Sequence, residues 1–225
     1  RINPKEKKIV AYHESGHALL AETTKGAKKV SKVSIVPRGL AALGYTLNKP
    51  EEDKFMMQKH ELLAEVDVLL GGRAAEEVFI GEISTGAGND LERATDILKS
   101  MVQTYGMSDI AGLMVLEKSR QSFLGSGQPA AREYSEKMAE DMDSFIKASL
   151  NEHYQTVLAR LEEYKDAIES MVALLYKKEN ITGEEVRHII INFEKENGIE
   201  SKVEADSKTI EDELKADAKM AENEK

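Results

Sequence analysis

Apolar residues recur at helical spacing along most of this chain, three and four positions apart, so that each stretch has one side to bury. The pattern predicts helices over residues 5–24, 54–70, 91–105, 132–164, 166–178 and from 183 onward. Gly71-Gly72 is expected to interrupt the second helix, and residues 73–79 to continue it. Two capping boxes mark helix starts: Asn89 with Glu92, and Thr182 with Glu185.

Two short stretches follow a different pattern. Residues 30–36 alternate apolar and polar positions, and residues 43–47 form a second short run before Asn48. We interpret them as a small antiparallel pair beside the first helix. The predicted fold class is therefore mainly α: a helical domain with a small antiparallel β element, followed by a long-helix bundle.

The same pattern divides the chain into three parts. Residues 1–131 form the half that carries the candidate chemistry, and residues 132–193 the helical half of the same domain. Residues 194–225 hold too few apolar side chains to offset the entropy of ordering, so we expect a charged, disordered tail. A mobile loop is expected around residues 119–130, which contain glycine, serine and proline.

Composition narrows the classes of function. The net charge of −10 argues against nucleic acid as a main partner, because phosphate binding needs clustered lysine and arginine. Cysteine is absent, so a metal would have to bind histidine and carboxylate groups. No apolar run is long enough to cross a bilayer, so we expect no direct membrane contact by this fragment. The chain starts at Arg1 without an initiator methionine, and we expect it to be a piece of a longer protein.

The chemistry centres on His13-Glu14-Ser15-Gly16-His17, the H-E-x-x-H pattern of zinc peptidases. Histidines four positions apart lie on one face of a helix and can hold one metal ion, with Zn²⁺ the best fit. Glu14 lies about 100° round the helix, where its carboxylate can take a proton from a water molecule. The alternative is a pair of buried, hydrogen-bonded histidines without a metal.

A catalytic zinc site needs a third protein ligand. Leu20 and Thr23 occupy the positions where metzincins carry glycine and histidine, so that class is excluded. The favoured candidate is Asp90, which follows a run of small residues and is free if Asn89 caps the helix. The remaining candidates are Glu76, Glu77 and His60.

The short second strand is the candidate substrate site. An edge strand beside the metal could pair with an extended substrate backbone. The residues proposed for this role are Leu43, Gly44, Tyr45 and Thr46. The alternative is an ordinary structural hairpin.

Six segments, in this order, resemble one family: the C-terminal peptidase domain of the FtsH family, membrane-anchored AAA+ ATP-dependent zinc proteases. They are Ala11-Tyr12-His13-Glu14-Ser15-Gly16-His17-Ala18, Val36-Pro37-Arg38-Gly39, Leu43-Gly44-Tyr45, Gly71-Gly72-Arg73-Ala74-Ala75-Glu76, Ser84-Thr85-Gly86-Ala87-Gly88-Asn89-Asp90 and Tyr105-Gly106-Met107-Ser108. The resemblance covers most of residues 5–192. One departure is Ser15, where the family commonly has alanine, and we expect this change to be harmless.

The resemblance implies that the helical fold is a zincin-like peptidase domain. It implies a zinc endopeptidase that hydrolyses unfolded or membrane-extracted proteins. It implies one Zn²⁺ per chain on His13, His17 and Asp90, with Glu14 as the general base. It also implies a homohexamer and an AAA+ ATPase domain in the same polypeptide. The parent would be anchored in an inner membrane, with this domain on the cytoplasmic, matrix or stromal side. The chain has no G-x-x-x-x-G-K-[ST] motif, so ATP would act only through the ATPase module.

A second hypothesis belongs to a different class. The helices of residues 132–193 could form a non-catalytic oligomerisation or adaptor surface. The first hypothesis is favoured, because an adaptor gains nothing from an H-E-x-x-H pattern.

Overall fold

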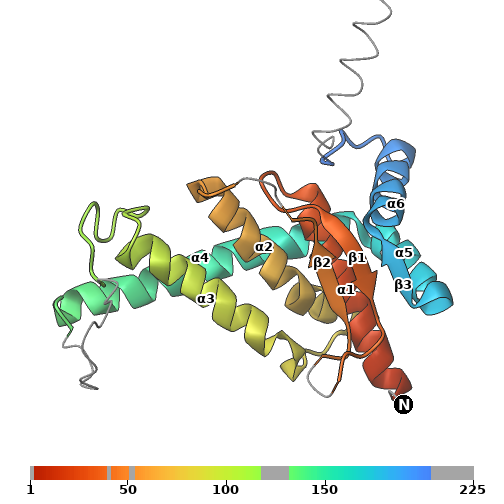
Figure 1. The fold of residues 1–225 in the computed structure, drawn as a ribbon, viewed down its shortest axis with the longest axis horizontal. Helices are drawn as coiled ribbons and strands as arrows, with labels where there is room; N and C mark the ends of the chain where they lie inside the picture. Colours follow the sequence, from red (N-terminus) through yellow and green to blue (C-terminus); the bar gives the residue numbers. More distant parts are fainter. Residues whose placement is uncertain (1–2, 40–41, 51–53, 118–131, 204–225) are drawn as a thin grey trace, which may run out of the picture.

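The computed structural model describes residues 3–39, 42–50, 54–117 and 132–203, and Figure 1 shows their arrangement. The α-helices are α1 (Pro4–Thr23), α2 (Lys59–Ala75), α3 (Gly88–Gln103), α4 (Glu136–Glu163), α5 (Lys165–Lys178) and α6 (Gly183–Glu196). A π-helical turn, η1 (Glu76–Ile80), and a 3-10 turn, η2 (Thr85–Ala87), connect α2 to α3. The strands are β1 (Val30–Ser34), β2 (Tyr45–Asn48) and β3 (Asn180–Thr182). The predicted fold class is confirmed: mainly α, with a small antiparallel sheet.

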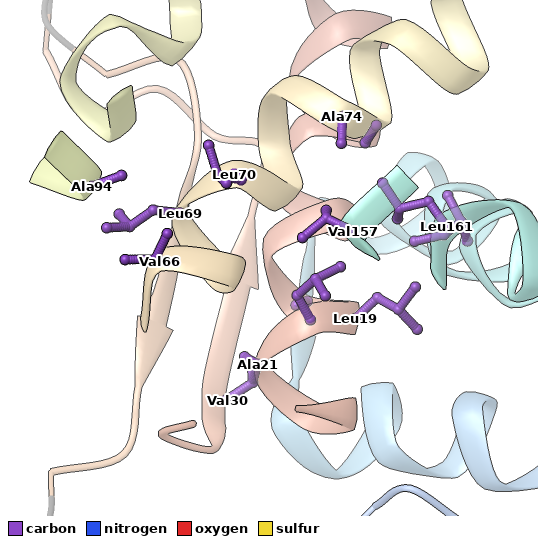
Figure 2. Close-up of a cluster of buried hydrophobic side chains, with 14 of the residues drawn as sticks. Leu19, Ala21, Val30, Val66, Leu69, Leu70, Ala74, Ala94, Val157 and Leu161 are labelled. Carbon is purple, nitrogen blue, oxygen red and sulfur yellow. The ribbon is translucent and has the colours of Figure 1, made fainter. Parts of the chain in front are cut away.

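Helix α1 is the central element of the fold. Asn3 caps its first turn by accepting a hydrogen bond from Lys5 N at 2.9 Å, and Pro4 occupies the first turn. Every residue from Ala11 to Thr23 except Glu14 is buried, so neighbours cover α1 on all sides. Figure 2 shows Leu19 of α1 near Val157 and Leu161 of α4. The candidate histidines are therefore fixed in the most enclosed helix of the molecule.

Gly71-Gly72 does not interrupt the second helix, and that prediction was wrong: α2 continues to Ala75. The glycines mark the place where two helices cross in close contact. A Cβ atom added at Gly71 would lie 2.8 Å from the carbonyl oxygen of Gly16 in α1. Each glycine costs about 1 kcal/mol relative to alanine within a helix. Here the missing side chains let α1 and α2 approach backbone to backbone.

The sheet has the order β2-β1-β3, with both pairs antiparallel. The predicted pairing of the first two strands is confirmed, with Val33 of β1 opposite Thr46 of β2. Strand β3 was not predicted, and it places Ile181 on the other side of Val33. Because β2 lies at the end of the order, one of its edges has no partner strand among the described residues.

Several predicted helix boundaries differ from the structure. Helix α2 begins at Lys59 and not at residue 54. The capping box of Asn89 with Glu92 is wrong, because α3 already begins at Gly88, after Ala87. The box at Thr182 is confirmed: its hydroxyl accepts from Glu185 N at 3.1 Å. The loop expected at residues 119–130 lies outside the described residues.

The predicted tail differs at its start. Helix α6 continues to Glu196, and the buried carboxylate of Glu194 accepts from the Tyr164 hydroxyl at 2.9 Å and from Lys202 N at 2.7 Å. Ile199 and Val203 pack against the core. Residues 194–203 are therefore held by the fold, and residues 204–225 lie outside the described part. No helix within that part has both the length and the hydropathy needed to cross a membrane.

Candidate metal centre

Three side chains from two helices bring their donor atoms together. His13 and His17 lie one turn apart on α1, and their Nε2 atoms are 3.0 Å from each other. Asp90, in the first turn of α3, places Oδ2 3.1 Å from His13 Nε2 and 3.3 Å from His17 Nε2. Both histidines are buried and Asp90 is half-buried. The three atoms thus form a compact N₂O set.

The outer nitrogens of both imidazoles are occupied, which fixes how the rings face. His17 Nδ1 lies 2.7 Å from the carbonyl oxygen of Val68, which can only accept, so this nitrogen carries the proton. His13 Nδ1 lies 2.7 Å from Oε1 of Glu76, and it donates to that carboxylate. In the neutral form of each ring the Nε2 atom therefore presents a lone pair inward, the arrangement that a metal-ligating histidine needs.

The donor set fits a divalent cation. Two nitrogen lone pairs and a carboxylate oxygen within 4.8 Å of one another repel unless positive charge lies among them. The pKa values of His13 and Asp90 are shifted by the same close approach. Burial lowers the pKa of His13, but hydrogen bonds with Asp90 and Glu76 outweigh it and raise the pKa to about 9. Burial raises the pKa of Asp90, but its hydrogen bonds with His13 and His17 hold it well below the usual range. Two imidazoles and one carboxylate are ligands that Zn²⁺ accepts.

Gly72 shapes the wall of this centre. A Cβ atom added there would lie 2.6 Å from both His13 Cε1 and His17 Nε2. The backbone of α2 therefore borders the donor atoms directly, and any side chain at this position would occupy their space. Sequence reasoning missed this role. The signal was present as a glycine pair inside an otherwise helical pattern, which can indicate close approach as well as a break.

The other third-ligand candidates lie elsewhere. Glu76 is fully buried in η1, where it contacts the far nitrogen of His13 and its Oε2 accepts from Ser84 N at 2.6 Å. Burial raises the pKa of Glu76, but hydrogen bonds with His13 and Ser84 outweigh it, so the pKa is lowered. Glu77 is exposed and accepts from the Tyr154 hydroxyl. His60 is exposed and lies against Gly26. Of these four candidates, only Asp90 reaches the two inward nitrogens.

Glu14 and the second strand meet beside the histidines. The carboxylate of Glu14 is half-buried, and its Oε2 accepts from the Thr46 hydroxyl at 2.7 Å. Tyr45 faces the other way, with the Arg38 guanidinium 3.9 Å above its ring. Leu43 is exposed, and Gly44 packs against α1. Of the residues predicted for substrate binding, Gly44 and Thr46 thus lie next to the candidate base.

Two helical histidines with an acid between them and a carboxylate from another helix define a metallopeptidase type of centre. The chain belongs to peptidase family M41, whose family model matches residues 1–189. Similar curated proteins are named ATP-dependent zinc metalloprotease FtsH. The one from Helicobacter felis is 67% identical over 90% of this chain and 32% of its own length. Those from Sulfurovum sp. and Thermotoga maritima are 59% and 43% identical, over 97% and 86% of this chain and 33% and 32% of theirs. The chain thus spans about a third of the length of these relatives.

Proposed function

We propose that this chain is the zinc-dependent endopeptidase part of an ATP-dependent protease. One Zn²⁺ per chain would be held by His13, His17 and Asp90. The observation that carries the proposal is the convergence of three donor atoms from His13, His17 and Asp90, with both outer histidine nitrogens already bonded. The family model and the names of the relatives support the same chemistry.

The reaction is hydrolysis of a peptide bond. When bound, Zn²⁺ supplies a Lewis acid that lowers the pKa of water to about 7 and polarises a carbonyl group. Glu14 accepts the proton of the attacking water and then donates it to the leaving amine nitrogen. Glu76 and the Val68 carbonyl keep the two imidazoles in one tautomer and one orientation. Residues 43–46, which lead into β2, align the substrate backbone by strand pairing along the edge of β2 that has no partner strand among the described residues.

The rest of the protein follows from the relatives. Their names support an ATPase module in the same polypeptide, which would deliver unfolded or membrane-extracted proteins to this domain. We further propose a homohexamer and a membrane-anchored parent, with this domain on the cytoplasmic, matrix or stromal side. In this arrangement residues 1–131 carry the chemistry and residues 132–193 complete the same domain.

The test separates metal binding from cleavage. In the full-length protein, Glu14→Gln should keep one zinc per chain by mass spectrometry and lose casein hydrolysis by about 100-fold or more. Glu77→Gln is the matched control and should keep both properties, because its side chain is exposed and outside the donor set. Undiminished hydrolysis in Glu14→Gln would refute the assigned base. Self-association with no hydrolysis at any zinc concentration would favour the adaptor hypothesis instead.

A further inference from the structure

A hydrogen bond from the sheet fixes the carboxylate of Glu14. Thr46 Oγ1 lies 2.7 Å from Glu14 Oε2, and 3.4 Å from the carbonyl oxygen of the same residue. A carboxylate oxygen and a backbone carbonyl oxygen both accept hydrogen bonds, so the Thr46 hydroxyl is the donor to Glu14. This bond joins β2 to α1, two elements 32 positions apart in the chain.

The local backbone is shaped to allow this contact. Gly44 directly precedes β2, and Thr46 lies within it. Residues two positions apart in an extended chain face the same side, and here that side faces α1. A Cβ atom added at Gly44 would lie 2.8 Å from the carbonyl oxygen of Ser34 and 3.3 Å from Cγ of Glu14. The missing side chain at position 44 therefore brings the strand near enough for the hydroxyl at position 46 to reach the carboxylate.

The contact limits the motion of a flexible group. The end of a free glutamate side chain samples several rotamers, and a hydrogen bond to it favours one of them. With Oε2 bonded to Thr46, Oε1 has no hydrogen bond to any described residue and can accept one from a water molecule. A general base must lie within about 2.6–3.2 Å of the atom whose proton it accepts, so a group that holds it in place affects the rate.

We propose that Thr46 is a positioning residue: its hydroxyl holds the Glu14 carboxylate in the orientation in which Glu14 acts as the base. This inference rests on the proposed function, because it needs Glu14 in that role. Strand β2 would then have two roles: pairing with the substrate backbone, and holding Glu14 through the Thr46 side chain. The competing explanation is that the bond only fastens β2 to α1.

The first experiment measures the contact without activity. In metal-free full-length protein, urea unfolding of this domain is followed for Thr46→Val, Glu14→Ala and the double variant. Valine keeps the shape and strand preference of threonine and removes only the hydroxyl. The urea midpoint of the double variant should equal that of the less stable single variant, because each single substitution already removes the hydrogen bond between Thr46 and Glu14. Additive midpoint shifts would overturn the proposal.

The second experiment uses the zinc-loaded enzyme and a fluorogenic peptide. Thr46→Val should lower kcat about 10- to 100-fold, with KM and zinc stoichiometry unchanged, because only the base is misplaced. Thr46→Ser, which restores a hydroxyl, should recover kcat to within a few-fold. Thr95→Val is the matched control: within the described part of the chain, the hydroxyl of Thr95 bonds to the Leu91 carbonyl alone, at 2.8 Å, so kcat should not change.

The outcomes distinguish the two proposals. A raised KM with unchanged kcat in Thr46→Val, or no recovery in Thr46→Ser, would overturn the positioning role and leave Glu14 as the base. Full activity in Glu14→Gln would overturn the proposed function, and with it the positioning role. In the Glu14→Gln background, Thr46→Val should have no further effect on the residual rate, because the two changes act on one step.

Discussion

Ser15 buries a hydroxyl group at no evident benefit to the fold. The side chain is fully buried, and its Oγ has no hydrogen-bond partner among the described residues. An unsatisfied buried polar group costs about 1–3 kcal/mol, and alanine is also the better helix former. Ser15→Ala should therefore raise the free energy of unfolding by about 1 kcal/mol in urea titrations, with zinc content unchanged. A lower free energy of unfolding would show that the hydroxyl has a partner.

In the proposed function, Glu76 would act on the metal through His13. Glu76→Gln keeps a carbonyl oxygen for His13 Nδ1 but removes the charge that holds the proton there. We expect zinc affinity to fall about 10- to 100-fold, as is typical when the partner of a ligating histidine is changed. Competition with a fluorescent chelator measures this change. Glu77→Gln, one position along the same turn, should keep wild-type affinity, and equal losses in both variants would contradict the role of Glu76.

The histidine pair could be predicted at the residue scale because its signal is local. A spacing of four places both rings on one helix face whatever surrounds them. The third donor depends on how α3 meets α1, which no short spacing encodes. Asp90 was chosen partly on the argument that Asn89 caps its helix, whereas α3 begins at Gly88 with Ala87 in the cap position. That supporting argument was wrong; Asp90 lies beside the histidines all the same, and its role as a ligand stays a prediction.

At the scale of elements, the two glycines of α2 have separate tasks. Gly72 borders the donor atoms, whereas Gly71 touches the backbone of Gly16. Gly72→Ala should fold, since alanine favours the helix, but its methyl group would occupy the space beside His17 Nε2 and abolish zinc binding in calorimetry. Gly71→Ala should instead lower the free energy of unfolding by more than about 2 kcal/mol, because two backbones must separate. The reverse pattern would contradict this division.

Sequence patterns succeeded for elements that bury one face and failed where tertiary contacts decide. The α4 and α5 helices appear close to their predicted ranges, because their apolar stripes are long. The glycine pair was taken as a break because its crossing partner, Gly16, lies far away in the chain. Strand β3 is three residues long, and only its pairing with β1 makes it a strand. The start of α2 was placed five residues early for a similar reason, since the apolar side chains before Lys59 are exposed and no packing extends the helix.

At the scale of the whole molecule, the candidate metal centre is built from helices that are distant in the sequence. The donors come from α1 and α3, and the groups that orient them come from α2 and η1. Without metal, positive charge on His13 takes over part of this linking role. Its folded pKa of about 9 exceeds the ordinary value of 6.5. The stabilisation is thus complete below pH 6.5 and is lost as the pH rises through about 9.

The metal-loaded protein should behave in the opposite way, because zinc needs the neutral imidazole and binds more tightly as the pH rises. We therefore expect the difference in free energy of unfolding between zinc-loaded and chelator-treated protein to grow from pH 6.5 to 9. The metal-free protein alone should lose up to about 3 kcal/mol over this range. Urea titrations at several pH values measure both states. His153, whose pKa is raised by its hydrogen bond with Asp67, contributes to both states and cancels in the difference. Parallel pH profiles would mean that His13 does not exchange its proton for the metal, and so that the cation is held elsewhere.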